Sequence, residues 1–275
     1  MDQAQIDFAA ALIGRIDSGE RNVFLDSVNT EKQIECKLFG EGVFFACLFE
    51  KGLRIHIAFE TDTGEFNEEI AALVRGALKK TGGAACVIWL WNDNRKIIEY
   101  LKETFHITTE RDYASIEFVM RRENFHPAPN ETLEIRPYEP RRLFAYLNLL
   151  AHSMTFSGAP RYWRYVIHSA RGFAKYAKND AFEAFWKDGK LIGVYWRKTH
   201  VPEVNTIAVA DGYQRRGYGT IILTRAIEMI FQHTDKECAY LYAVDWNVKG
   251  QSFYRKYGME ENGHSYCLHV ENYRE

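Results

Sequence analysis

The sequence from residue 205 to residue 220 reads Asn205-Thr206-Ile207-Ala208-Val209-Ala210-Asp211-Gly212-Tyr213-Gln214-Arg215-Arg216-Gly217-Tyr218-Gly219-Thr220. Its apolar beginning predicts a buried strand, its glycines predict a turn, and the residues from Thr220 to about His233 predict a helix. The first N–H groups of a helix have no partner within the helix, and the helix dipole adds partial positive charge there. This strand, turn and helix therefore predict a phosphate-binding site.

Two pairs of residues strengthen that prediction. Gly217 and Gly219 allow the backbone to approach a phosphate closely. Arg215 and Arg216 place guanidinium groups beside the free amides, and such groups bind phosphate oxygens. We expect a pyrophosphate at this turn.

The carboxy-terminal half alternates strands and helices around the turn. A two-residue turn at Asp188-Gly189 predicts a hairpin, because glycine tolerates a positive φ. The expected strands are 132–136, 181–187, 191–198, 205–210, 238–245 and 264–270, and the expected helices are 141–154, the stretch from Pro160 to about 178, 220–233 and 249–257.

The amino-terminal half shows part of the same order. Strands are expected at 33–39, 42–49, 53–59, 85–91 and 114–121, and helices at 67–80 and 95–104. An offset of 153 residues, the distance from Asn94 to Asn247, superposes these elements on the second half and brings Gly64 onto Gly217. The shared order indicates a duplicated fold, and two unrelated α/β halves are the alternative.

The prolines indicate where the chain divides. None occurs before Pro127, and Pro127 and Pro129 lie two residues apart in a segment that cannot be helical. We expect a first domain at residues 1–126, a linker at 127–130 and a second domain at 131–275.

A second motif follows the turn at a fixed distance. Asn247 precedes Ser252-Phe253-Tyr254-Arg255-Lys256-Tyr257-Gly258-Met259. Together with Gln214-Arg215-Arg216-Gly217-Tyr218-Gly219, this segment resembles the GNAT superfamily of N-acetyltransferases, with Met259 replacing the usual phenylalanine. The resemblance covers about residues 131–272. It implies an α/β (α+β) chain of two tandem GNAT-like domains, each a mixed, mainly antiparallel twisted sheet flanked by helices.

The resemblance also implies acetyl-CoA as cofactor and assigns roles to individual positions. The backbone of Ile207, Ala208 and Val209 would pair with the pantetheine arm. Tyr254 stands at the position of the general acid, and Glu203 stands where many members place a general base. The remaining cofactor-binding positions are Gln214, Arg215, Arg216, Gly217, Tyr218, Gly219 and Thr220 for the pyrophosphate, Asn247 for the pantetheine, and Ser252 and Phe253 for the far side of the cofactor.

The implied reaction moves an acetyl group to a primary amine, in a small molecule, by direct attack once both substrates are held together. Tyr162, Trp163 and Tyr195 are candidates for the substrate pocket, and core packing is the alternative reading of these aromatic side chains. A non-catalytic acyl-CoA sensor is the competing function.

The front half lacks the features of the phosphate turn. At the same offset the turn becomes Thr61-Asp62-Thr63-Gly64-Glu65-Phe66, where Asp62 and Glu65 would repel a polyanion. Phe66 replaces a glycine, and Leu101 stands where Tyr254 stands. We expect a degenerate domain without a cofactor site.

Composition excludes several other classes. The chain of 275 residues has 35 basic and 37 acidic side chains, and its formal charge of -2 disfavours nucleic acid or an anionic membrane as partner. We expect no membrane span, no secretory signal and a cytoplasmic location. Five cysteines without a Cys-x-x-Cys pair predict reduced thiols, and the lack of a His-Glu-x-x-His motif predicts no metal site. The sequence leaves the oligomeric state open.

Overall fold

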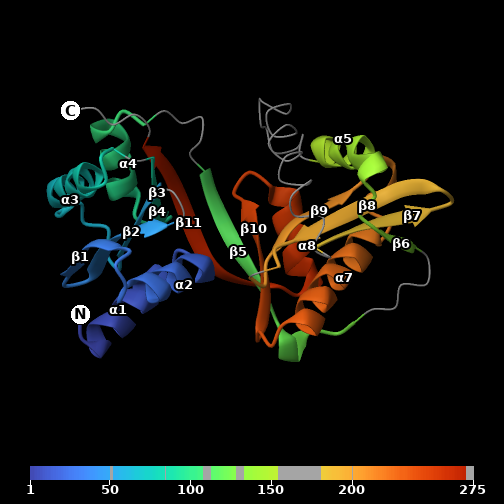
Figure 1. The fold of residues 1–275 in the computed structure, drawn as a ribbon, viewed down its shortest axis with the longest axis horizontal. Helices are drawn as coiled ribbons and strands as arrows, with labels where there is room; N and C mark the ends of the chain where they lie inside the picture. Colours follow the sequence, from blue (N-terminus) through green and yellow to red (C-terminus); the bar gives the residue numbers. More distant parts are fainter. Residues whose placement is uncertain are drawn as a thin grey trace. The chain divides into compact units, whose positions relative to one another are not determined.

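A computed structural model describes residues 1–49, 52–83, 85–107, 113–127, 133–153, 181–199 and 201–270. By contacts, the chain forms two compact units, one of Met1–Glu117 with Glu261–Glu275 and one of Phe118–Glu260. Each unit combines helices with a mainly antiparallel sheet, as expected (Figure 1).

Strand pairing explains why this division differs from the one expected at residues 126–131. The last strand, β11 (Glu260–Val270), pairs antiparallel with β4 (Cys86–Trp91) from Ser265 opposite Trp91 to Val270 opposite Cys86. Most of β11 therefore belongs to the first unit, although the first and last residues of that unit are far apart in sequence. Prolines mark where a local element ends, but pairing between distant segments decides which residues pack together.

The first unit has helices on both faces of its sheet (Figure 1). Its strands follow the order β1-β2-β3-β4-β11-β5. Helices α1 and α2 pack on one face, and α3 and α4 on the other. The bounds are α1 (Gln3–Ile13), α2 (Ser18–Ser27), β1 (Gln33–Phe39), β2 (Gly42–Phe49), β3 (Gly52–Phe59), α3 (Asn67–Lys80), α4 (Arg95–Thr104) and β5 (Tyr113–Arg121).

Strand β2 shows how this layering is encoded. Val43 and Phe45 pack into the core under α1 and α2, whereas Phe44 and Ala46 pack into the core under α3 and α4. Successive side chains of a strand point to opposite faces, so a strand covered on both faces needs apolar residues at every position.

Helices α1 and α2 precede the first element expected from the sequence, and each begins at an acidic cap. The Asp2 carboxylate accepts from the Gln5 amide, and the Gln5 side chain accepts from the Asp2 amide in return. The Asp17 carboxylate accepts from the Glu20 amide at the start of α2.

The second unit is built on the sheet β6-β7-β8-β9, with α5 on one face and α7 on the other. The expected hairpin is present, with φ of 50° at Asp188 and 72° at Gly189. Gly193 lets α7 approach β8, because a Cβ there would lie 2.4 Å from the Cδ1 of Ile222. The bounds are β6 (Glu134–Pro137), α5 (Leu143–Ser153), β7 (Phe182–Lys187), β8 (Lys190–Arg197), β9 (Val204–Val209), α7 (Tyr218–His233), β10 (Cys238–Val244) and α8 (Val248–Tyr257).

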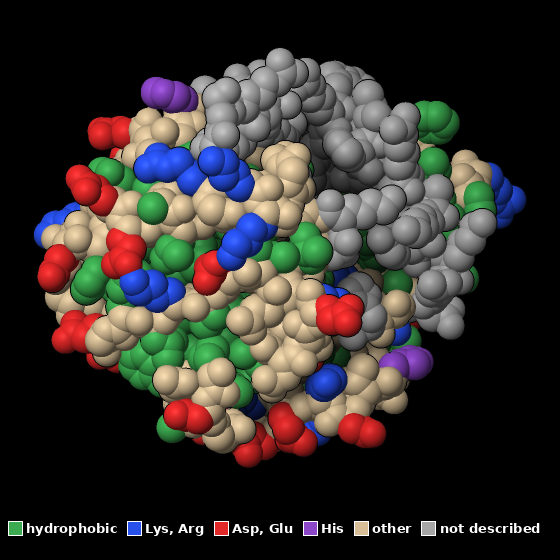
Figure 2. All heavy atoms as spheres, turned by 60° about the vertical axis from the view of Figure 1, so that its left-hand side comes forward, with side chains coloured by type: hydrophobic (Ala, Val, Ile, Leu, Met, Phe, Trp, Pro, Cys, Tyr) green, Lys and Arg blue, Asp and Glu red, His purple; other side chains and the backbone are tan. Residues whose placement is uncertain are grey.

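Surface charges are interspersed on the face shown in Figure 2, where Lys and Arg alternate with Asp and Glu. Among the described residues, no helix is long and apolar enough to cross a membrane.

Candidate active site

Strands β9 and β10 run parallel but meet at one end only. Glu203 and Tyr240 form an isolated parallel bridge, and the Tyr240 amide donates to the Pro202 carbonyl at 2.9 Å. Beyond this point the two strands belong to different sheets. The edge of β9 that faces β10 therefore leaves backbone groups from Asn205 onward without a strand partner, and such groups need another hydrogen-bonding partner.

A groove of about 1410 Å³ opens along this edge, entirely within the second unit. Its walls come from β9, the turn after it, β10 and α8. The predicted cofactor residues that line it are Ile207, Ala208, Val209, Gln214, Arg215, Gly217, Gly219, Thr220, Asn247, Ser252 and Phe253.

The turn between β9 and α7 contributes the start of a helix to the groove wall. Gly217 caps α7 with φ of 84° and supplies no side-chain cap, whereas the Thr220 amide donates to the Gly217 carbonyl at 3.0 Å. Arg215 also has a positive φ, of 58°. Gln214 holds the turn together, since its Nε2 lies 3.1 Å from both the Val209 carbonyl and the Asp211 carboxylate. The uncapped amides at a helix start are suited to bind an anion.

Arg216 and Tyr218 are the two predicted cofactor residues that do not line the groove. The guanidinium of Arg216 lies over the ring of Tyr213, 5.8 Å from its centroid. The hydroxyl of Tyr218 accepts from Lys187 Nζ at 3.0 Å. These side chains occupy the outer side of the same turn.

Helix α8 carries the second predicted motif. The Asn247 Oδ1 accepts from the Gly250 amide at 2.9 Å, so Asn247 caps this helix and its Nδ2 is left to donate. Tyr254 lines the groove with 8% of its surface exposed, and its ring packs against Phe118 and Phe253. Burial raises the pKa of Tyr254 to about 12, so its phenol stays protonated at neutral pH.

Glu203, the expected base, lies at the closed end of β9 and does not line the groove. Its carboxylate is 6% exposed, bonds to Lys198 Nζ at 2.6 Å and accepts from Asn205 Nδ2 at 3.3 Å. Glu203 is therefore a buried, paired carboxylate outside the groove wall, although the resemblance implied a general base there.

Of the three residues expected in the substrate pocket, the structure describes Tyr195. Tyr195 is completely buried in β8 beside Phe185, which fits the core-packing alternative. Burial raises the pKa of its phenol. Tyr162 and Trp163, like the expected helix after Pro160, lie outside the described residues.

Sequence analysis missed one wall of the groove, formed by Met120, Asn124, Phe125 and His126. Arg122 fixes this segment, because its guanidinium donates to the carbonyls of Phe231, Thr234 and Lys236 at the end of α7. The contact joins residues more than a hundred positions apart, so no local pattern predicts it. The groove also receives Ser153, Tyr242, Lys249 and Lys256, among others.

The corresponding strands of the first unit do not diverge. Strands β3 and β4 pair in parallel from Leu53 opposite Cys86 to Ile57 opposite Leu90. Asn94, the counterpart of Asn247, is buried and bonds to both the amide and the carbonyl of Phe59 at 2.9 Å. The edge of β3 is therefore closed by the protein itself.

The turn after β3 is also filled. Phe66 packs against Phe39 and Phe59, and the Asp62 carboxylate accepts from the Lys96 amide at the start of α4. Leu101, the counterpart of Tyr254, is buried in the core.

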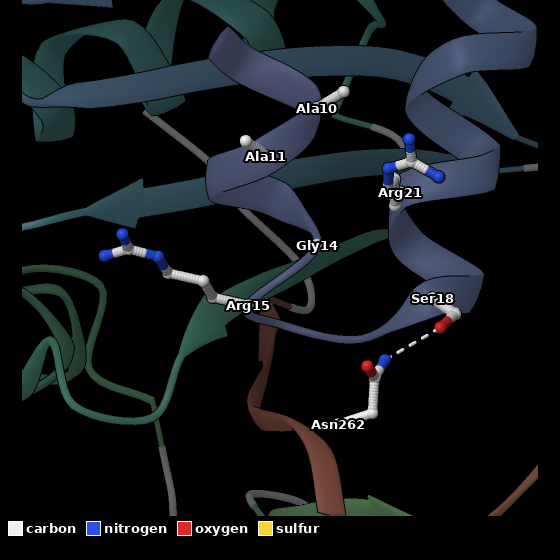
Figure 3. A pocket seen from close by; sticks show the side chains of 7 residues that line it. All are labelled: Ala10, Ala11, Gly14, Arg15, Ser18, Arg21 and Asn262. Atoms are coloured by element: carbon white, nitrogen blue, oxygen red, sulfur yellow. Dashed lines mark hydrogen bonds between the residues drawn. The ribbon is translucent and has the colours of Figure 1, made fainter. Parts of the chain in front are cut away.

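A smaller hollow of about 380 Å³ lies in the first unit at the turn between α1 and α2 (Figure 3). Asn262 and Ser18 meet there, and both donate to the Glu117 carboxylate. Arg15 points away from them and pairs with Glu60. None of the residues predicted to act in catalysis or cofactor binding lines this hollow.

Comparison with known proteins finds a family for the part of the chain that supplies most of the groove lining. Residues 144–259 match the family described as acetyltransferase (GNAT), whose members use acetyl-CoA as acyl donor. A protein named mycothiol acetyltransferase, from Acidimicrobium ferrooxidans, is 24% identical in an alignment 201 residues long that covers 69% of this chain. The match spans 64% of that relative's length.

Two solved structures share the fold. A GCN5-related N-acetyltransferase from Sphaerobacter thermophilus superposes with a TM-score of 0.57 at 12% identity, over 100% of this chain and 96% of its own. A conserved protein of unknown function from Staphylococcus epidermidis superposes with a TM-score of 0.56 at 13% identity, over 91% of this chain and 98% of its own.

Proposed function

Residues 144–259 form a GNAT acetyltransferase domain, and from this premise we propose that the chain transfers an acetyl group from acetyl-CoA to a primary amine of a small molecule. The observation that carries the proposal is the groove between β9 and β10, which combines unpaired strand groups with an uncapped helix start. An extended amide-containing arm and a pyrophosphate are complementary to these two features.

The groove residues fit acetyl-CoA in a defined order. The free edge of Ile207, Ala208 and Val209 would hold the pantetheine amides. Arg215 and the amides from Gly217 to Gly219 would hold the pyrophosphate, beside the Thr220 side chain. Ser252 and Phe253 would line the opposite wall. Bound acetyl-CoA supplies the activated acetyl thioester.

Tyr254 would hold the proton that the departing thiolate takes up. Its phenol is protonated at neutral pH and lies on the groove wall. A thiol has a pKa of about 8.5, so its thiolate leaves readily and the proton donor assists rather than decides the step.

The proton acceptor for the amine has two candidates. Glu203 was expected from the family resemblance but is paired with Lys198 away from the groove wall. His126 lines the groove, and a neutral imidazole can accept a proton. Measurement of kcat/KM across pH for Glu203→Gln and His126→Gln would distinguish the two candidates. Only the variant that lacks the base should lose the fall in kcat/KM at low pH.

A similar protein and the net charge of the chain support a small molecule as the acetyl acceptor. The relative named mycothiol acetyltransferase supports a small molecule as acceptor. The formal charge of -2 offers no general attraction for RNA or DNA.

We further propose that the first unit binds no acetyl-CoA. Paired strands β3 and β4 and the Asn94 bonds to Phe59 occupy the place that the groove occupies in the second unit. Asp62 and Glu65 would add like charge beside a phosphate.

Release of free CoA from acetyl-CoA in the presence of a panel of amines tests the proposal. We expect release with at least one small amine and none with Gly217→Glu, whose side chain would enter the phosphate turn. Binding of acetyl-CoA without release for any amine would instead favour the non-catalytic acyl-CoA sensor.

A further inference from the structure

Four side chains form a cluster on the outer side of the phosphate turn, and we name it the outer cation cluster. Its members are Lys187 at the end of β7, Tyr213, Arg216 and Tyr218. Lys187 Nζ lies 3.0 Å from the Tyr218 hydroxyl and 5.5 Å from the centroid of its ring. The rings of Tyr213 and Tyr218 lie 6.2 Å apart, so the four side chains are contiguous.

Two positive charges are held together in this cluster. The hydrogen bond with Tyr218 raises the pKa of Lys187, the charge of the neighbouring Asp188 raises it further, and the charge of the nearby Arg216 opposes this shift. In the part of the chain that the structure describes, neither Lys187 nor Arg216 has a carboxylate within ion-pair distance. Like charges placed side by side repel unless an anion joins them.

The nearest acid on the turn is already engaged. The Asp211 carboxylate accepts from Gln214 Nε2 at 3.1 Å, as part of the bonds that hold the turn. The Asp211 carboxylate is therefore engaged within the turn and is not paired with Arg216.

The cluster lies beside the groove without being part of it. Arg215 lines the groove, whereas Arg216, the next residue, does not. The chain turns sharply here, with a positive φ at Arg215 and at Gly217. An anion bound by Arg216 is thus a different group from the one that meets the amides of α7.

We propose that the outer cation cluster is a second anion site, which binds the 3′-phosphate on the ribose of the acyl donor. This inference rests on the proposed function. That phosphomonoester carries most of two negative charges at pH 7 and has three acceptor oxygens. Arg216 would bind two of these oxygens, Lys187 would add a point charge, and the Tyr218 hydroxyl would donate. The pyrophosphate and the 3′-phosphate would then bind on opposite sides of one turn.

The test compares CoA with dephospho-CoA, which lacks only the 3′-phosphate. Dissociation constants for both are measured by calorimetry on the wild type and on the Lys187→Gln, Arg216→Gln and double variants. Two charge-assisted contacts predict that the wild type binds CoA about 10- to 100-fold more tightly than dephospho-CoA. The double variant is expected to bind the two equally, with an unchanged dissociation constant for dephospho-CoA.

Two matched variants serve as controls. Lys236→Gln removes an exposed lysine beyond the other end of α7. This variant is expected to keep the wild-type ratio of the dissociation constants for CoA and dephospho-CoA. Lys249→Gln removes a cation from the α8 wall of the groove. The inference would be overturned if Lys249→Gln lost the preference for CoA over dephospho-CoA while the double variant kept it. The 3′-phosphate would then bind at α8.

Other outcomes separate this inference from the proposed function. If the double variant bound both ligands more weakly by the same factor, the inference would also be overturned, while the groove would remain the CoA site. Failure of the wild type to bind either ligand would contradict the proposed function itself and the inference with it. Circular dichroism of each variant checks that it is folded.

Discussion

Tyr254, the proposed proton donor, is a buried residue that also lines the groove. It lines the groove, and its ring is held between Phe118 and Phe253. Because burial raises its pKa to about 12, the phenol remains protonated across the range in which a thiolate needs a proton.

Replacing the hydroxyl should therefore slow the chemical step and leave binding intact. We expect Tyr254→Phe to lower kcat by about 100-fold or less, because thiolates are good leaving groups, with KM for acetyl-CoA nearly unchanged. Tyr257→Phe is the matched control, since Tyr257 also lines the groove but bonds to Thr224. An unchanged kcat in Tyr254→Phe would remove this residue from the mechanism.

A buried polar network in the first unit predicts how stability depends on pH. His56 is fully buried, with its Nε2 2.7 Å from the Glu20 carboxylate, which also accepts from Arg54. Burial lowers the pKa of His56 from 6.5, and the Glu20 contacts oppose that shift only partly. Burial likewise raises the pKa of Asp17, and this group contributes stability that is lost as pH rises.

The lowered pKa of His56 contributes stability that is present above pH 6.5 and is lost as pH falls below it. Comparison with His56→Asn isolates this effect from that of Asp17. In urea unfolding, we expect the wild type to exceed the variant in stability by more at pH 7.5 than at pH 5.5. A difference that is the same at both pH values would contradict the assignment.

At the scale of an element, the turn before α7 requires a glycine for two reasons. Gly217 has a φ of 84°, and its amide belongs to the uncapped start of the helix. Gly217→Ala is expected to cost about 1 kcal/mol of stability and to weaken acetyl-CoA binding.

Gly189 offers a matched control with the same strain. Its φ is 72°, and it lies in the β7–β8 hairpin, outside the groove. Gly189→Ala should cost similar stability without changing the dissociation constant for acetyl-CoA. Equal weakening of binding by both variants would show that general destabilisation, rather than the phosphate turn, explains the loss.

The paired strands of the first unit predict opposite roles for two equivalent asparagines. Asn94→Ala leaves the amide and carbonyl of Phe59 without partners and should cost about 1–3 kcal/mol of stability, with no effect on acetyl-CoA affinity. Asn247→Ala should lose the cap of α8, at about 1 kcal/mol, and also weaken binding. Weaker acetyl-CoA binding in Asn94→Ala would contradict the closed first unit.

The elements themselves were largely predictable from sequence. The hairpin at Asp188-Gly189 and the helices 67–80 and 95–104 occur as expected, because turn residues and helical periodicity are local signals. Helices α1 and α2 were missed, although Asp2 with Gln5 and Asp17 with Glu20 are local cap signals. That Arg215 lines the groove and Arg216 does not could not be predicted, because a sequence motif carries no side-chain directions within a turn.

On the scale of the whole molecule, both halves contain the same order of elements, three strands followed by helix, strand, helix and strand. They differ in the fourth strand, which pairs closely in the first half and diverges in the second. The sequence indicated the repeat, but β11 completes the first unit through pairs between residues such as Ser265 and Trp91. Pairing over that distance leaves no local pattern.

The central claim is that one groove, in the second unit, binds acetyl-CoA. Calorimetric titration with acetyl-CoA tests it most directly when the wild type is compared with Gly217→Glu and with Gly64→Glu, a change at the equivalent positive-φ glycine of the first unit. The account predicts one site per chain in the wild type and in Gly64→Glu, and none in Gly217→Glu. Two sites in the wild type, or binding that survives in Gly217→Glu, would contradict it.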